Sequence, residues 1–139
     1  MNQAEGNRRL ATILAVDIVG YSAAAERDQA AAAQQVAALR ARVVELAALH
    51  GGRLFHTAGD GFMMEFPLAS AAVRAAVALL NEAADAAGTL PRVRAGAHLG
   101  EVIVDGDDLL GHGVNVAARH GAHRAGDCAA EGARVAHCR

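Results

Sequence analysis

Apolar residues follow two different spacings in the first part of the chain. Residues 10–19 form a nearly continuous apolar run, which predicts a β-strand buried on both faces. Over residues 22–50 the apolar positions recur every three or four residues, which predicts an amphipathic helical region that stops at Gly51 and Gly52. A break near Asp28 is predicted to divide this region into two helices.

The middle of the chain predicts a hairpin followed by a helix. Residues 53–57 and 62–66 are short runs with alternating apolar residues, and the Asp-Gly pair that begins at Asp60 favours a tight turn between them. Asp60 is therefore expected at the tip of a β-hairpin. Pro67 begins a segment with helical spacing that ends by Gly88.

The last patterned segment predicts a second hairpin. Apolar residues alternate over residues 93–97, Gly100 interrupts them, and residues 102–104 resume the pattern before a cluster of turn residues. Residues 114–119 predict the start of a helix, whereas residues 120–139 have no clear strand pattern. The order strand, helix, hairpin, helix, hairpin, helix predicts an α+β sandwich.

The composition favours one domain with a core of small side chains. A chain of 139 residues can form one domain with its own hydrophobic core and is too short for two. About half of the chain is apolar (53%), but only 3% is aromatic, so Val, Leu, Ile and Ala must fill the core. Oligomerisation would bury more surface than these side chains bury within one subunit.

Charge and hydropathy argue against several classes of partner. A net charge of -2 gives no electrostatic reason to expect nucleic acid. No apolar stretch approaches the roughly 20 residues of a membrane span, and residues 1–9 lack the apolar stretch of a signal peptide. A cytoplasmic location without a membrane partner is therefore expected, with Cys128 and Cys138 as reduced thiols.

Two aspartates suggest a metal site. Asp17 lies near the end of the first predicted strand, beside a glycine-containing turn whose backbone N–H groups can hold phosphate. Asp60 lies at the predicted hairpin tip. Each aspartate alone is also explained as a cap or turn residue. Together, carboxylates from two strands supply the oxygen ligands that a pair of hard divalent ions requires.

Four motifs in this order resemble class III adenylate and guanylate cyclases. They are AVDIVGYS at residues 15–22, TAGDGF at 57–62, GAHLGEV at 96–102 and DDLLGHGVNVAAR at 107–119. The resemblance covers about residues 9–119 and implies a ferredoxin-like, palm-type α+β fold, with helices packed on an antiparallel-rich sheet. It also implies that the protein converts ATP or GTP to a 3′,5′-cyclic nucleotide and pyrophosphate.

The resemblance assigns roles to the metal residues. It implies that Asp17 and Asp60 bind two Mg²⁺ or Mn²⁺ ions, helped by the backbone carbonyl of Ile18. One ion would activate the ribose 3′-hydroxyl, and the other would offset charge on the leaving pyrophosphate. The turn implied to contact the triphosphate consists of Val19, Gly20, Tyr21 and Ser22.

The resemblance also implies a homodimer with shared sites. Asn115 and Arg119 lie four residues apart on one face of the predicted helix, where the family orients the ribose and stabilises the charge of the transition state. A solvated helix face is the alternative explanation. In the family, the metal aspartates come from one subunit and the Asn-Arg pair from the other, so two chains must associate head to tail.

Purine selection departs from the family pattern. Adenylate cyclases usually place Lys at the position of His56, while Asp108 matches the aspartate that receives the exocyclic amine of adenine. A neutral histidine can donate one hydrogen bond to adenine N1 but lacks a permanent charge. Weaker selection that still favours ATP over GTP is therefore predicted, unless His56 is a tolerated residue in a degenerate site.

The end of the chain departs further. After Arg119 the family continues into strands that complete the sheet and supply a lysine, and here these strands are expected to be truncated. The chain is thus divided into a polar arm (1–9), a catalytic core (10–119) and an atypical tail (120–139) whose composition resembles a shifted reading frame. Zinc binding is the weaker explanation, because the spacing fits no compact motif. The candidate zinc residues are His120, His123, Cys128, His137 and Cys138.

Two functional hypotheses follow. The intact metal and Asn-Arg motifs favour an active cyclase, whereas His56 and the truncated strands favour a catalytically degenerate module that dimerises or binds nucleotide for regulation. A diguanylate-type cyclase would need a different hairpin, with a Gly-Gly-Asp/Glu-Glu-Phe sequence, which residues 59–62 do not supply.

Overall fold

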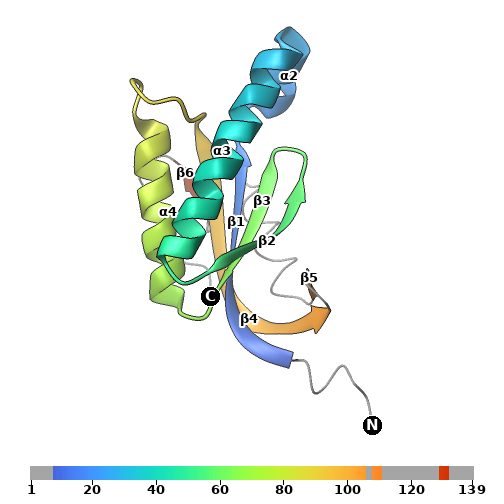
Figure 1. The fold of residues 1–139 in the computed structure, drawn as a ribbon, viewed down its shortest axis with the longest axis vertical. Coiled ribbons are helices and arrows are strands. Elements are labelled where there is room, and N and C mark those ends of the chain that lie inside the picture. Colours follow the sequence, from blue (N-terminus) through green and yellow to red (C-terminus); the bar gives the residue numbers. More distant parts are fainter. Residues whose placement is uncertain (1–7, 106–107, 111–128, 132–139) are drawn as a thin grey trace.

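The computed structural model describes residues 8–105, 108–110 and 129–131. These residues form an antiparallel sheet with two long helices against one face (Figure 1). In chain order the elements are β1 (Arg8–Ile18), α2 (Tyr21–Arg27), α3 (Gln29–Leu49), β2 (Arg53–Ala58), β3 (Gly61–Phe66), α4 (Ala69–Ala84), β4 (Val93–Asp105), β5 (Asp108–Leu110) and β6 (Ala129–Glu131).

The first strand is the centre of the sheet. The strand order is β2-β3-β1-β4-β5, with β6 paired to β4, and every pairing is antiparallel. Helices α3 and α4 lie side by side on one face (Figure 1). The α+β fold with an antiparallel sheet and helices packed on it is confirmed.

Side chains of β1 alternate between two hydrophobic clusters. One set packs with α3 and α4 on the helix side of the sheet, and consists of Leu14, Val16 and Ile18. The other set belongs to a smaller cluster with Val102 and consists of Ala11, Ile13 and Ala15. Because successive side chains of a strand point to opposite faces, both faces of β1 are buried, as its continuous apolar run predicts.

Local chemistry sets the ends of the helices. Asp28 is extended, and its Oδ1 accepts a hydrogen bond from the Ala31 amide at 3.1 Å, which begins α3 and explains the break from α2. After Leu49, Gly51 adopts a φ of 76°, and the Gly52 amide donates to the Ala47 carbonyl at 2.8 Å. The predicted boundaries near Asp28 and Gly51 are confirmed.

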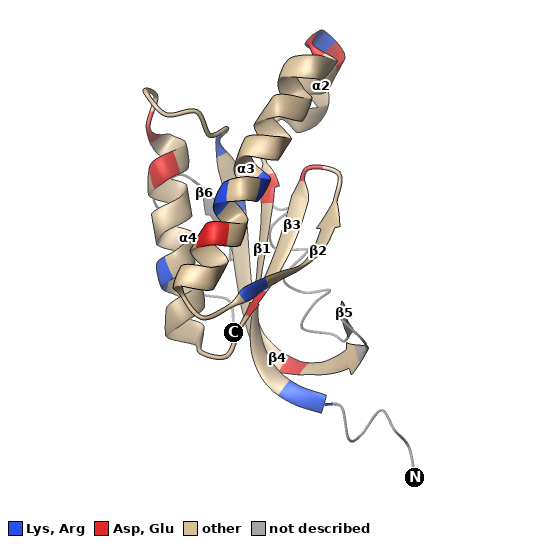
Figure 2. Ribbon diagram, in the orientation of Figure 1, with Lys and Arg blue, Asp and Glu red and all other residues tan. Residues whose placement is uncertain are grey.

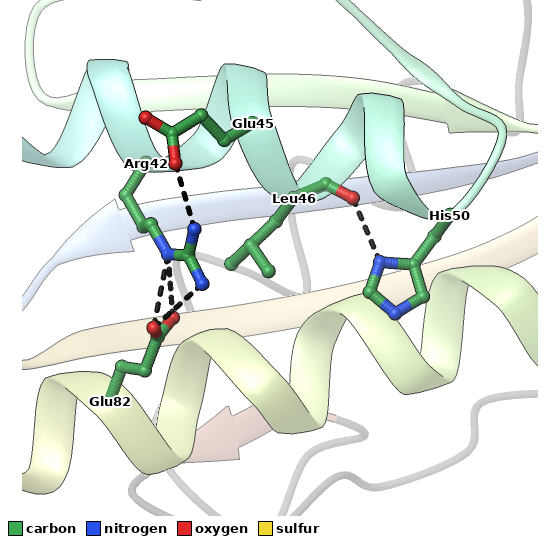
Figure 3. Close-up of polar contacts among 5 residues, drawn as sticks. All are labelled: Arg42, Glu45, Leu46, His50 and Glu82. Atoms are coloured by element: carbon green, nitrogen blue, oxygen red, sulfur yellow. Dashed lines mark hydrogen bonds and ion pairs between the residues drawn. The ribbon is translucent and has the colours of Figure 1, made fainter.

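Helices α3 and α4 pack closely through alanine and leucine. The side of α4 that faces the core is built mainly from small residues, which are Ala71, Ala72, Ala75, Ala76 and Ala83. At the surface Arg42 donates to both carboxylate oxygens of Glu82 and to Glu45 (Figure 3). His50 Nδ1 donates to the Leu46 carbonyl at the end of α3. Of these contacts, the one between Arg42 and Glu82 links α3 to α4.

Two sequence predictions need correction. Gly100 does not end a strand, because β4 pairs with β1 without interruption from Val93 to Ile103, and Gly100 lies opposite Ala11 within that ladder. The hairpin of this region joins β4 to β5 instead. The tail also contains a strand, since β6 pairs with the beginning of β4, at Arg94 to Gly96.

The charged residues of the sheet lie mainly near the ends of the strands (Figure 2). At the end remote from the hairpin tip, the buried Glu65 carboxylate contacts Arg9 at 2.6 Å and Arg53 at 2.5 Å. Burial alone would raise the pKa of Glu65, but the hydrogen bonds and charges of the two arginines together hold it below its usual value. Glu65 therefore joins β1, β2 and β3.

We predict that Glu65→Gln lowers the free energy of unfolding by about 1–2 kcal/mol at neutral pH, because charged hydrogen bonds to half-exposed arginines are lost. The folded pKa of Glu65 is depressed, so its contribution is present above the unfolded pKa and is lost as pH falls through the folded pKa. Urea denaturation should show the two proteins converging at acid pH. A difference independent of pH would contradict this assignment.

Candidate active site

The position of Asp17 follows from the sheet register. Asp17 lies opposite Gly61 of β3 on one side and opposite Arg94 of β4 on the other. It is the residue before the last in β1, on the face of the sheet opposite the helices. The central strand therefore delivers this carboxylate to a point between the β2-β3 hairpin and β4.

The hairpin tip brings Asp60 to the same point. Strands β2 and β3 pair up to Ala58 and Gly61, so Gly59 and Asp60 form a two-residue turn. Gly59 has a φ of 58°, which suits glycine, and the Asp-Gly pair is displaced by one position from the turn centre. Asp60 Oδ2 accepts a hydrogen bond from the Ile18 amide at 3.1 Å. The predicted hairpin with Asp60 at its tip is confirmed.

The two carboxylates influence one another. Burial raises the pKa of the Asp17 carboxyl, the hydrogen-bonded Arg94 guanidinium lowers it, and the charge of Asp60 raises it again, with a net increase. Arg94 Nε lies 3.1 Å from Asp17 Oδ1, and both side chains are 23% exposed. The pair is thus partly desolvated, and a bound cation would relieve the repulsion between the carboxylates.

Arg94 was not predicted from the sequence as a site residue. Its position near the start of β4 resembles an ordinary exposed strand residue, and only the ladder places it opposite Asp17. The register between β1 and β4 would have pointed to Arg94, but the apolar patterns of two strands do not fix their register.

Only part of the predicted triphosphate turn is free to contact a phosphate. The Val19 amide already donates to the Arg92 carbonyl at 2.9 Å. Tyr21 is partly buried and packs against the helix-side core, so its side chain does not face Asp17. Gly20, with a φ of 69°, and Ser22 are exposed. The Val19 amide and the Tyr21 side chain are thus not offered to a phosphate in this structure.

His56 shares a cavity with Asp17. The cavity, of about 220 Å³, is lined by both residues and by apolar residues that include Phe62 and Met63. Strand β4 curves so that β5, which begins at Asp108, lies close to β2, which carries His56 (Figure 1). The two strands of the predicted purine selector are therefore neighbours, although the side chain of Asp108 lies outside the described part.

The predicted metal set is compatible with divalent ions that take oxygen ligands from a substrate. Asp17 and Asp60 are hard oxygen donors held beside each other. Within the ranges described, no group of three or more His, Cys, Asp or Glu residues gathers as a potential metal site. Asn115, Arg119 and the candidate zinc residues of the tail lie outside those ranges.

Comparison with known proteins finds several similar chains. No protein-family model matches the chain. It is 46% identical over 118 residues to Putative adenylate cyclase 3 of Rhizobium meliloti (strain 1021), covering 81% of this chain and 20% of that protein. It is 32% identical to the adenylate/guanylate cyclase/hydrolase from Silicibacter pomeroyi, with a TM-score of 0.71, covering 83% of this chain and 70% of the other.

A third similar structure supports the fold alone. The catalytic core of a rhodopsin-guanylyl cyclase with converted specificity, solved in complex with ATPαS, is 18% identical, with a TM-score of 0.74, covering 90% of this chain and 76% of that chain. The protein therefore belongs to the family of class III adenylate and guanylate cyclase catalytic domains. It spans about a fifth (20%) of the length of its Rhizobium relative. No helix in the described segments is long and apolar enough to cross a membrane.

We predict that Mn²⁺ raises the melting temperature of the protein and that Asp17→Asn abolishes the increase. A ligand at 100 times its dissociation constant stabilises the folded state by about 2.7 kcal/mol. The effect should weaken at acid pH, because protons compete with the ion for carboxylates. Differential scanning calorimetry measures the shift.

Asp85→Asn is the matched control for this measurement. Asp85 follows α4, and its Oδ1 accepts a hydrogen bond from the Ala87 amide. The side-chain oxygen of asparagine can accept the same hydrogen bond. An equal Mn²⁺ shift in Asp17→Asn and in Asp85→Asn would exclude the metal site at Asp17.

Proposed function

We propose that the protein is a nucleotide cyclase that converts a purine nucleoside triphosphate, ATP in preference to GTP, to a 3′,5′-cyclic nucleotide and pyrophosphate. The observation that carries the proposal is the pair of carboxylates, Asp17 and Asp60, held together by the Ile18 amide in a member of the cyclase family. Such a pair suits a reaction in which an oxygen nucleophile attacks a phosphorus centre.

Asp17 and Asp60 would hold two Mg²⁺ or Mn²⁺ ions, together with the backbone carbonyl of Ile18. When bound, the ions supply Lewis acidity for the 3′-hydroxyl and for the leaving pyrophosphate. The hydrogen bond from the Ile18 amide fixes one oxygen of Asp60, which leaves its other oxygen for coordination. Asp17 is oriented through its two contacts with Arg94.

Arg94 adds a positive charge to the substrate side of this pair. Its guanidinium lies beside the Asp17 carboxylate and is partly exposed, and an arginine can bind phosphate oxygens through two donors at once. Gly20 and Ser22, on the exposed turn after β1, would contact the same triphosphate. These residues would orient the phosphates, while His56 and Asp108 would select the purine.

A homodimer with shared sites completes the proposal. The cavity beside Asp17 measures about 220 Å³, whereas sites that enclose a small molecule usually measure about 300–1,000 Å³. A partner subunit that contributes Asn115 and Arg119 would close the site around the ribose and stabilise the developing charge. Each dimer would then contain two sites.

A catalytically degenerate module is the second candidate. His56 favours it, because a histidine, which lacks the permanent charge of lysine, takes the place of the lysine that adenylate cyclases usually carry. This module would dimerise and bind nucleotide in the same cavity without turnover. The two candidates differ in whether cyclic nucleotide forms in the presence of Mn²⁺.

We predict that mixing two inactive variants restores turnover. Asp17→Asn damages the metal half of a shared site and Arg119→Ala the opposite half, so a mixed dimer has one intact site. Random exchange of subunits should recover about a quarter of the wild-type rate. The measurement is conversion of radiolabelled ATP in Mn²⁺, with each variant alone as the control. If each variant alone is inactive and the mixture recovers no turnover, shared sites are contradicted.

We also predict that His56→Lys raises the preference for ATP over GTP. A charged donor toward adenine N1 should favour ATP by about 1–2 kcal/mol, or roughly 5- to 30-fold in kcat/KM. Parallel assays with ATP and GTP measure the ratio, and His50→Lys, at the end of α3, is the control. An unchanged ratio would remove His56 from purine selection.

A further inference from the structure

Strand β2 contains one residue that has no opposite residue in its partner strand β3. Leu54 lies opposite Met64 and His56 lies opposite Met63, so the register shifts between them and Phe55 is the additional residue. Such a β-bulge places two residues of one strand against one residue of the other, and bulges often change the direction of a side chain near an active site.

The bulge places two consecutive side chains on the same face. Leu54 packs against the helix-side cluster, and Phe55 packs against the cluster on the opposite face. Regular alternation would return His56 to the helix side. His56 instead lines the cavity with Asp17 and Met63, on the same face as Phe55.

The two side chains differ in depth. Phe55 is partly buried, whereas His56 is exposed. Phe55 therefore fills an inner position against the buried cluster that contains Ile13 and Ala15, and His56 remains at the mouth of the cavity. Without Phe55, a regular strand would place His56 in that inner position.

Both ends of the strand are fixed independently of Phe55. Arg53 is held by Glu65 at one end, and Ala58 lies opposite Gly61 at the hairpin tip at the other. Removing Phe55 would leave these pairings, including the two-residue turn of Asp60, in a regular ladder. The additional residue thus affects the depth of His56 and not the position of the metal carboxylates.

We propose that Phe55 is a positioning residue for purine recognition, which holds His56 outward over the nucleotide cavity. The proposal rests on the proposed cyclase function, because it assigns His56 a purine to contact. It differs from a structural role for Phe55, which would change stability without changing the choice between ATP and GTP.

Deletion of Phe55 is the first test. The deletion variant should keep Mn²⁺-dependent turnover but lose the ATP preference, by up to about tenfold in the ratio of kcat/KM values, the equivalent of one hydrogen bond. In a His56→Ala background the deletion should change the ratio no further, because the two effects are coupled. Phe55→Leu should preserve the ratio, since leucine still fills the inner position.

Leu54→Ala is the matched control, because it truncates an apolar side chain of β2 on the opposite face. Loss of selectivity in this control equal to that in the deletion would overturn the proposal. So would an effect of the deletion that persists in the His56→Ala background.

The second test does not depend on cyclase activity. Diethylpyrocarbonate should modify the exposed His56 of the intact protein faster than the half-buried His50, as followed by mass spectrometry of peptides. Deletion of Phe55 should bring the two rates together. An unchanged rate at His56 would overturn the positioning role, even if the protein turned over no nucleotide. Failure of turnover with the expected modification rates would instead contradict only the cyclase function.

Discussion

The hydrogen bond between the Ile18 amide and Asp60 determines the geometry of the candidate site. It joins the tip of the β2-β3 hairpin to the end of the central strand, at 3.1 Å. Asp17 is the preceding residue, so the same contact holds two carboxylates together although their charges repel. The register of the sheet brings the two partners of this hydrogen bond together, because the pairing of β1 with β3 places Gly61 opposite Asp17.

Charge is distributed unequally along the face of the sheet opposite the helices. At the hairpin tip, the guanidinium of Arg94 pairs with Asp17, and Asp60 adds a second carboxylate whose charge acts on Asp17. At the other end, Arg9 and Arg53 share the single carboxylate of Glu65. Negative charge is thus in excess at the hairpin tip, where cations would bind. The cluster of Glu65, Arg9 and Arg53 joins the strands at the opposite end.

The sequence predicts most elements of this fold because their signals are local. The apolar run around Val16, the cap at Asp28 and the turn at Asp60 each act within a few residues. Pairing across the sheet is not local. Gly100 suggested a strand end because its sequence neighbours give no sign of the ladder with β1, in which β4 continues past Gly100. Arg94 was missed for the same reason.

The candidate site divides in the same way. Asp17, Asp60 and His56 were predicted from motifs, and the structure places all three near the hairpin. The occupied amide of Val19 and the inward packing of Tyr21 depend on the tertiary fold, namely on Arg92 and on the helix-side core. The β-bulge at Phe55 depends on counting residues between two fixed pairings, which requires the register itself.

The central claim is that Asp17 and Asp60 form one site for two metal ions. The most direct measurement is a crystal structure of the protein grown with Mn²⁺ and a non-hydrolysable ATP analogue, with diffraction recorded at the manganese absorption edge. Two anomalous peaks within coordination distance of both carboxylates and of the triphosphate are predicted. Manganese bound elsewhere, with the Asp17–Arg94 pair unchanged and no peak beside Asp60, would contradict the claim.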